Sequence, residues 1–231
     1  MITGALVVRP EPGASRTRDR LAAIGVDALV QPLFDVVPVA WRPPDPDRFD
    51  ALLLTSANAL RHAGPGLAAF AHLPALAVGE ATAAAARAAG LTVALTGERD
   101  AAALLAAAKE AGFTRPLHLA GRDRVEAEVA AVTVYASEER RIAGNAEIEW
   151  EGRIALLHSA RAARRFAWLV DRDGVSRARI AVAALSPAVA EAVGEGWAAL
   201  TVAERPTDTA LVAAAAALID PPGSGVDKRR R

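Results

Sequence analysis

The sequence contains no cysteine, which excludes disulfide bonds, thiolate metal sites and cysteine nucleophiles. Histidine is scarce as well, and the four present form no HxH or HExxH spacing, so we expect no metal site. Neither sign of charge is in excess, because Lys and Arg together number 27 and so do Asp and Glu. The formal net charge of zero argues against a nucleic-acid partner or a membrane-surface role for the chain as a whole.

Long apolar runs and common catalytic motifs are also missing. No run approaches the roughly 18 apolar residues of a membrane span, and the N-terminal MITGALVVRPEP has no charged region before its apolar stretch. We therefore expect a cytoplasmic protein without a membrane partner. The patterns GxGxxG, GxxxxGK(S/T) and GxSxG are absent, so the sequence predicts no dinucleotide site, no P-loop and no nucleophile elbow.

What the sequence has instead is a repeated strand-to-helix pattern. An apolar run followed by a hydroxyl and further polar residues occurs at Asp50–Asn58 (DALLLTSAN) and again at Arg153–Arg161 (RIALLHSAR). The stretches that follow repeat in the same order, Ala77–Gly90 with Ala184–Gly196 and Gly97–Ala108 with Ala203–Leu218. The small drift in spacing predicts a duplicated α/β unit, and 231 residues suit two small domains.

Short apolar runs bounded by polar residues predict strands that are buried on both faces. We expect strands at Ala5–Arg9, Ala28–Val30, Ala51–Thr55, Ala75–Val78, Thr92–Leu95, Pro116–Ala120, Ile154–Leu157, Arg179–Ala183 and Leu200–Ala203. Helices are expected at Ser15–Ile24, after Ser56, at Glu80–Ala89, at Asp100–Ala111 and after each of the last three strands. Alternation of parallel strands with helices predicts the fold class, α/β with two parallel-sheet, three-layer domains of the flavodoxin-like type.

Two extended segments interrupt this alternation, Phe34–Trp41 (FDVVPVAW) and Thr133–Ala136 (TVYA). Pro38 suits an edge strand, because proline cannot donate a hydrogen bond to a neighbouring strand. The simplest geometry pairs the two segments as a two-stranded connector, with a cleft between the domains. We therefore predict a discontinuous first domain at residues 1–33 and 142–220, a connector at 34–41 and 132–141, a second domain at 42–131 and a disordered tail at 221–231.

Polar residues gather where six of the predicted strands end, and in open parallel sheets ligands bind beyond these carboxyl ends. The candidate binding residues are Arg9, Ser56, Asn58, Gly79, Thr82, Gly121, Arg122, Ser159 and Ser186. Hydroxyls, amides and arginines in this arrangement suit a ligand with many carboxylates. Each Ser, Thr or Asn taken alone also suits a helix N-cap, and it is the agreement between the two halves that favours binding.

Tyr135 is the only tyrosine, and it lies in the second extended segment. One interpretation is an aromatic side chain in a twisted ribbon, where such residues are common. The other is a phenol that donates a proton to a departing hydroxide without needing a charged acid. The residues alone leave both interpretations open.

The order and spacing of several motifs resemble the uroporphyrinogen-III synthase family over nearly the whole chain. These motifs are VVRPEP, QPLFDVVPV, LLLTSANAL, AVGEATAAAARAAG, LAGRD, VTVYASE, LLHSARAARRF and ERPTDTALV. The resemblance implies two α/β domains, the first discontinuous, joined by a two-stranded ladder. It also implies cyclisation of the linear tetrapyrrole hydroxymethylbilane, with inversion of ring D, to uroporphyrinogen III and water. The enzyme would then be a cytoplasmic monomer of haem biosynthesis, needing no metal or organic cofactor, with transient contact to hydroxymethylbilane synthase.

The resemblance also assigns roles to individual residues. Tyr135 matches the family tyrosine that is proposed to assist loss of water, and Thr82 matches the threonine of a VGxxTA motif. Ser56 and Ser159 match hydroxyls of the family's cleft. Two departures stand out: SPAVA, which begins at Ser186, replaces the usual threonines of the second repeat, and the segment between Gly121 and Tyr135 is shorter than usual, enough to remove a helix or strand.

Other classes of protein would use the same architecture. A catalytically silent homologue would keep the cleft and act as a two-lobed binding protein for a tetrapyrrole or another small molecule. A periplasmic receptor would need an export signal, which the sequence lacks, and a regulatory fusion would need a DNA-binding domain, for which the chain has no room.

Overall fold

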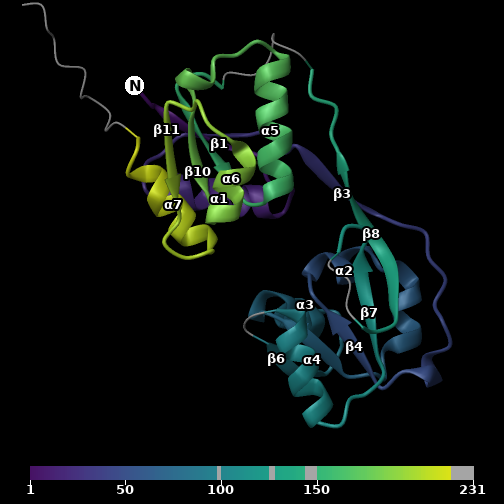
Figure 1. Cartoon of the computed structure of the whole chain (residues 1–231). Coiled ribbons are helices and arrows are strands. Elements are labelled where there is room, and N and C mark those ends of the chain that lie inside the picture. Colours follow the sequence, from purple (N-terminus) through teal and green to yellow (C-terminus); the bar gives the residue numbers. More distant parts are fainter. Residues whose placement is uncertain (98–99, 125–127, 144–149, 220–231) are drawn as a thin grey trace, which may run out of the picture. The chain divides into compact units, whose positions relative to one another are not determined.

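The computed structural model describes residues 1–97, 100–124, 128–143 and 150–219, and the predicted tail at 221–231 lies outside them. The chain divides into two compact units, which we describe separately. Unit 1 comprises Met1–Asp35 and Glu139–Arg231, and unit 2 comprises Val36–Glu138. Unit 1 is therefore built from both ends of the chain, coloured purple and green to yellow in Figure 1, and unit 2 from its middle.

Unit 1 contains a five-stranded parallel sheet in the order β11-β10-β9-β1-β2. The strands are β1 (Gly4–Val7), β2 (Ala28–Val30), β9 (Arg153–Leu157), β10 (Ala181–Ala184) and β11 (Ala199–Val202). Counted within the unit, this is the 2-1-3-4-5 order of flavodoxin-like sheets. The order reverses between β1 and β9, and the carboxyl ends of these two strands form the switch point at which such sheets bind ligands.

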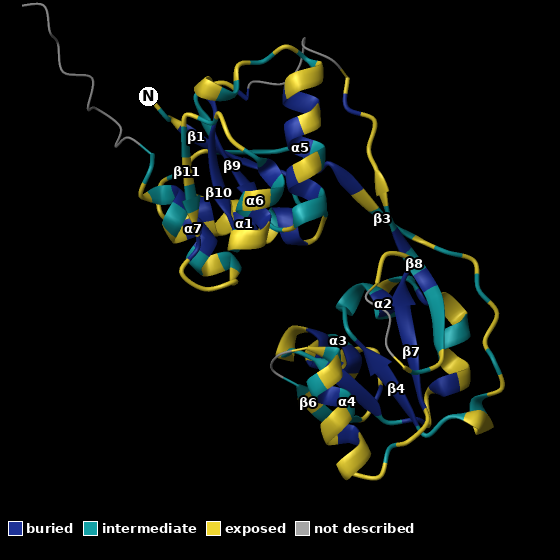
Figure 2. Ribbon diagram, in the orientation of Figure 1, coloured by how far each residue is buried: buried dark blue, intermediate teal, exposed yellow. Residues whose placement is uncertain are grey.

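Helices cover both faces of this sheet. They are α1 (Gly13–Ala22), α5 (Ala160–Arg172), α6 (Pro187–Val193) and α7 (Asp208–Ala216), with a 3-10 turn at Arg177–Arg179. Leu6 of β1 packs with α5 and α6, whereas its neighbours Ala5 and Val7 pack with α1 and α7 on the other face. The central strands are therefore almost wholly buried, as the dark blue of β9 and β10 in Figure 2 shows.

Unit 2 contains a six-stranded sheet in the order β3-β8-β7-β4-β5-β6. Its strands are β3 (Phe34–Pro38), β4 (Ala51–Leu54), β5 (Ala75–Val78), β6 (Val93–Gly97), β7 (Pro116–Gly121) and β8 (Ala131–Glu139). All neighbours from β6 to β8 pair in parallel. Counted from β4, the parallel strands have the order 3-2-1-4-5, so the switch point of this sheet lies between β4 and β7.

The helical layers of unit 2 are unequal. Its helices are α2 (Ala57–His62), α3 (Glu80–Ala88) and α4 (Ala101–Glu110), with 3-10 turns η1 (Pro46–Arg48) and η2 (Gly64–Phe70). One face of the sheet packs against α2, η2 and α3. On the other face α4 contacts β5 and β6, through Leu104 and Ala108. Within the described residues 122–124 and 128–130, no helix separates β7 from β8, as the short Gly121–Tyr135 segment predicts.

Strands β3 and β8 pair with each other, as the predicted connector requires. The N–H of Val39 donates to the carbonyl of Val134 at 3.0 Å and the N–H of Arg140 donates to that of Leu33 at 2.9 Å, so the two segments run antiparallel. In addition, β8 pairs in parallel with β7, so this ribbon continues the sheet of unit 2. β3 is the edge strand of that sheet, as Pro38 predicts.

The predicted fold class of two parallel α/β sheets is confirmed, with strand and helix ends shifted by one or two residues in most places. Two expectations need correction. The strand expected at Arg179–Ala183 begins only at Ala181, because Arg177–Arg179 form a 3-10 turn. The strand expected at Thr133–Ala136 is longer, because β8 has a partner on each side. None of the described helices is long and apolar enough to cross a membrane.

Candidate functional site

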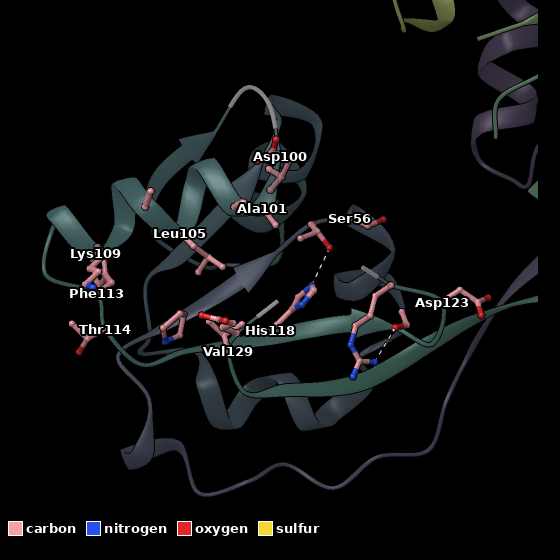
Figure 3. A pocket seen from close by; sticks show the side chains of 18 of the residues that line it. Ser56, Asp100, Ala101, Leu105, Lys109, Phe113, Thr114, His118, Asp123 and Val129 are labelled. Carbon is pink, nitrogen blue, oxygen red and sulfur yellow. Dashed lines mark hydrogen bonds between the residues drawn. The ribbon is translucent and has the colours of Figure 1, made fainter. Parts of the chain in front are cut away.

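The switch point of unit 2 borders a cavity of about 1070 Å³. Three residues predicted from the sequence line it: Ser56 after β4, Gly121 at the end of β7 and Tyr135 of β8. Figure 3 shows Ser56 near one end of this cavity and His118 on its floor. Residues from three different strands therefore meet at the edge where open parallel sheets bind ligands.

Tyr135 packs directly on Gly121. A Cβ added to Gly121 would lie 2.7 Å from Cζ and 2.9 Å from the hydroxyl oxygen of Tyr135, closer than atoms approach in proteins. Only a glycine therefore allows this position of the ring. The His62 ring lies 6.3 Å from the Tyr135 ring, centroid to centroid, and partial burial together with Arg61 lowers the pKa of His62. The structure places His62 half-buried beside Tyr135.

His118 is the main polar residue that the sequence analysis missed in this cavity. It is 3% exposed, and its Nε2 lies 3.0 Å from the hydroxyl oxygen of Thr55, the residue before Ser56. Burial, and then the charge of Arg124, lower the pKa of His118 to about 4. The imidazole is therefore neutral at pH 7. A histidine within the apolar run PLHLAG is the signal that would have identified it, because polar residues are rare in buried strands.

The remaining candidates in unit 2 have local partners. Ser56 is the N-cap of α2 and accepts from the N–H of Asn58 at 3.2 Å, while the side-chain oxygen of Asn58 accepts from Arg61 at 2.7 Å. Gly79 has a φ of +79° at the turn from β5 into α3. Thr82 is buried in the first turn of α3. Arg122 is exposed and forms an ion pair with Glu138 at 3.4 Å.

At the switch point of unit 1, the structure brings together residues that are far apart in the sequence. The carboxylate of Asp208, the first residue of α7, accepts from Thr17 of α1 at 2.7 Å and from Nε2 of His158 at 2.7 Å. It also accepts from Arg9 at 3.1 Å and from Arg20. We call Arg9, Thr17, Arg20, His158 and Asp208 the Asp208 network. Arg9, predicted to bind substrate, thus already has a carboxylate partner within the chain.

Electrostatics keep the Asp208 network in one charge state at neutral pH. Burial alone would raise the pKa of Asp208, but hydrogen bonds from His158 and Thr17 and the charge of Arg9 lower it well below its usual range. Burial lowers the pKa of His158, despite the nearby carboxylate. Asp208 is therefore charged and His158 neutral at pH 7. The sequence places His158 at a strand end but gives no sign of its contact with Asp208, fifty residues later.

The other two candidates in unit 1 begin helices. The hydroxyl oxygen of Ser159 accepts from the N–H of Ala162 at 3.1 Å and caps α5. Ser186 is the N-cap of α6, but its side chain makes no capping hydrogen bond. Both follow carboxyl ends of central strands, β9 and β10. Among the described residues, no cluster of three or more His, Asp and Glu is arranged to hold a metal ion.

Comparisons with known proteins agree on one family. A family model for uroporphyrinogen-III synthase HemD matches residues 15–213. A comparison with curated proteins finds no match. Among solved structures, the uroporphyrinogen-III synthetase of Helicobacter pylori 26695 aligns with a TM-score of 0.67 at 18% identity, over 93% of this chain and 99% of that chain. At this identity the likeness shows the fold alone.

Structures from a second organism align less closely. A uroporphyrinogen III synthase of Thermus thermophilus gives a TM-score of 0.38 at 15% identity, over 92% of this chain and 98% of that one. A mutant uroporphyrinogen III synthase from the same organism gives 0.48 at 14% identity, over 90% and 96%. The family match therefore carries the comparison, and the Helicobacter structure supports the two-domain fold.

Proposed function

The chain belongs to the uroporphyrinogen-III synthase family, and from this premise we propose that it converts hydroxymethylbilane to uroporphyrinogen III and water, with inversion of ring D. The observation that carries the proposal for this chain is the position of Tyr135, packed on Gly121 in a cavity at the switch point of unit 2. A tyrosine hydroxyl can donate a proton without carrying a charge.

In the proposed reaction, the carbon–oxygen bond of the hydroxymethyl group breaks while Tyr135 donates a proton to the leaving oxygen, and water departs. The resulting azafulvenium cation is an electrophile. The substituted carbon of ring D attacks it and forms a spiro intermediate. The bond from this carbon to its original methylene then breaks, the freed methylene bonds to the unsubstituted α-carbon of ring D, and the proton lost from that carbon restores the phenol. Most of the acceleration would come from holding the two ends of the substrate together.

The substrate is a polyanion with two acidic arms on each of its four pyrrole rings. Hydroxyls, backbone N–H groups and arginines bind carboxylates well without a metal. Ser56, Gly121 and Arg124 in unit 2 lie at the carboxyl ends of β4 and β7 or just beyond them, which supports this role for them. In unit 1 the N-terminus of α5, capped by Ser159, offers N–H groups of the same kind.

A product assay tests the proposal. The protein is supplied with hydroxymethylbilane, the products are oxidised, and the type I and type III isomers are resolved. We expect type III. Type I alone, the isomer of spontaneous closure, would show that the chain is a catalytically silent homologue that at most binds tetrapyrroles.

Tyr135→Phe tests the assignment of the proton donor. We expect turnover to fall by about a hundredfold, the lower range for loss of a general acid, with an unchanged circular dichroism spectrum. Unchanged turnover would remove Tyr135 from the mechanism without touching the proposed reaction. We also propose that the protein is a cytoplasmic monomer that contacts hydroxymethylbilane synthase transiently. Sedimentation of the two proteins, alone and mixed, tests the monomeric state and the contact.

A further inference from the structure

The cavity of unit 2 extends well beyond the switch point. Ser56 and Gly121 line it at the carboxyl end of β7, while Phe113 and Thr114 line it just before β7 begins. Figure 3 shows Ser56 toward one end and Lys109, Phe113 and Thr114 toward the other. The cavity therefore runs the length of a six-residue strand, about 20 Å.

The topology of unit 2 explains this shape. Two adjacent parallel strands are normally joined by a crossover of a dozen or more residues, usually with a helix that covers the sheet. Here only residues 122–130 lie between β7 and β8, and their described part contains no helix. On this face α4 contacts β5 and β6 and shares an apolar cluster with Ala51 and Leu53 of β4, and no described helix has its main contacts with β7 there. The cavity occupies that position.

Part of the wall of this cavity is apolar. Leu105 and Ala106 of α4 form one side, Val78 and Val129 contribute from β5 and the β7–β8 connection, and neutral His118 lies on the floor. Alanines along this flank of α4 leave room for a flat group beside the helix. A flat ring can therefore lie against α4 with the uncharged imidazole of His118 beneath it.

The charged groups of the cavity are of both signs. Lys109 in the last turn of α4 and Arg124 beyond β7 supply cations, and Arg124 is held by the hydroxyl of Thr133 at 3.1 Å. Carboxylates of Asp100, Asp123 and Glu128 also line the cavity. Asp100 caps α4 by accepting from the N–H of Ala103 at 2.8 Å. Such a mixture does not suit a simple polyanion.

It does suit a pyrrole ring with acidic arms. The arms are acceptors that need cations or N–H donors, and the ring N–H is a donor that needs a carboxylate, while the ring itself is flat and largely apolar. The volume of about 1070 Å³ lies just above the range of about 300–1,000 Å³ that is typical of small-molecule sites. It is sufficient for one ring with its two arms.

We propose that the cavity beside α4 binds the terminal pyrrole ring that carries the hydroxymethyl group. This assignment rests on the proposed function, because it uses the substrate of that reaction. Tyr135 lines the same cavity, so a ring held there presents its leaving oxygen to the phenol. Arg124 lies beyond the same end of β7 as Tyr135 and binds an acidic arm of this ring, and the cavity thereby selects which end of the linear substrate reaches Tyr135.

A matched pair of α4 variants tests the site. Ala106 and its neighbour Ala107 are both exposed, but only Ala106 lines the cavity. We would titrate wild type, Ala106→Trp, Ala107→Trp and Arg124→Gln calorimetrically with a pyrrole that bears one acetate arm, one propionate arm and a methyl group in place of the hydroxymethyl group. We expect Ala106→Trp and Arg124→Gln to weaken binding by about tenfold or more, and Ala107→Trp to bind like wild type.

The same variants are then assayed with hydroxymethylbilane, where KM should rise about tenfold for Ala106→Trp and stay unchanged for Ala107→Trp. Arg124 is exposed, so its replacement keeps the test valid where Ala106→Trp fails to fold. The assignment is wrong if Ala106→Trp and Arg124→Gln bind the pyrrole as tightly as Ala107→Trp does. It is also wrong if the wild type does not bind the pyrrole. If the wild type yields only the type I isomer, the proposed function is wrong. Calorimetry alone then decides whether the cavity binds pyrroles.

Discussion

Asp208→Asn is the most informative substitution, because it removes one charge at the point where four side chains converge. The Asp208 carboxylate is 14% exposed and accepts from Thr17, His158, Arg9 and Arg20. Asparagine has nearly the same shape and keeps one acceptor oxygen. The change therefore leaves packing almost intact and isolates the contribution of the charge.

The expected cost is about 2–3 kcal/mol of unfolding free energy. Breaking a buried ion pair by removing one partner typically costs 3–5 kcal/mol, and hydrogen bonds to charged groups contribute about 1.5–3 kcal/mol each. We take a lower value because Arg9 is 27% and Arg20 45% exposed, so water compensates part of the loss. For a chain of this size, the loss corresponds to a melting temperature lower by about 5–10 °C.

The distribution of tryptophans allows unit 1 to be observed alone. Trp150, Trp168 and Trp197 belong to unit 1, and Trp41 belongs to unit 2. In a Trp41→Phe background, fluorescence during urea unfolding reports only on unit 1. Trp150 is the most sensitive reporter, because it is 1% exposed and packs 5.3 Å from the Phe166 ring, centroid to centroid.

Asp19→Asn is the matched control. Asp19 lies on α1 and pairs with Arg18 at 2.8 Å, but its side chain is 65% exposed, so we expect a change of less than about 0.5 kcal/mol. Equal effects of the two substitutions would refute the view that the Asp208 network stabilises unit 1.

The pH dependence of the same measurement provides a second criterion. The folded-state pKa of Asp208 lies below its ordinary value near 4, so its contribution is complete above that value and is lost as pH falls through the folded-state pKa. Because Asp208 also raises the pKa of His158, the comparison is made in a His158→Gln background, where the difference between the chains with and without Asp208→Asn should be constant between about pH 7 and 5 and shrink below about pH 4. A difference that grows on acidification would contradict the reasoning.

Three further predictions concern unit 2. Gly121→Ala should lower turnover about as much as Tyr135→Phe, measured by product formation, because its Cβ would displace the phenol; a turnover equal to wild type would show that the ring's position is unimportant. Ser56→Asp should keep the N-cap and change stability by less than about 0.5 kcal/mol, but raise KM about tenfold by repelling substrate carboxylates, and an unchanged KM would leave Ser56 as a cap alone. The pKa of His118 is lowered from its ordinary value near 6.5 to about 4, so unit 2 should lose up to about 3 kcal/mol of stability as the pH falls from about 6.5 to 4. Hydrogen exchange of the β7 amides measures this loss, and His118→Asn should remove it.

The elements of this fold are readable from the sequence because each depends on local patterns. Runs such as ALLL at Ala51–Leu54 have the length and composition of strands buried on both faces, and Ser56 and Ser159 precede helices as N-caps do. Such features can be predicted from the sequence, because their causes lie within a few neighbouring residues.

Contacts between distant segments are not readable in this way. Asp208 looks like an ordinary acidic residue in the first turn of a helix, and nothing near it in the sequence indicates Arg9 or Thr17, which are about 200 residues away. The cavity beside α4 is similar, because it lies where the described residues of the β7–β8 connection form no helix. The short segment indicates that an element is missing there, but the shape of the resulting space depends on α4, which lies on the neighbouring strands.

The two units use equivalent positions in opposite ways. In unit 2 the switch point is open, and Ser56, Gly121 and Tyr135 border a cavity there. In unit 1 the corresponding crevice between β1 and β9 already holds a carboxylate, that of Asp208, with the cations that an external anion would need. Since an incoming carboxylate would have to displace Asp208 from donors as close as 2.7 Å, tight binding of a substrate arm by Arg9 requires the network to open. The two switch points therefore differ: the one in unit 2 borders a cavity, whereas the strongest donors at the one in unit 1 are already engaged within the chain.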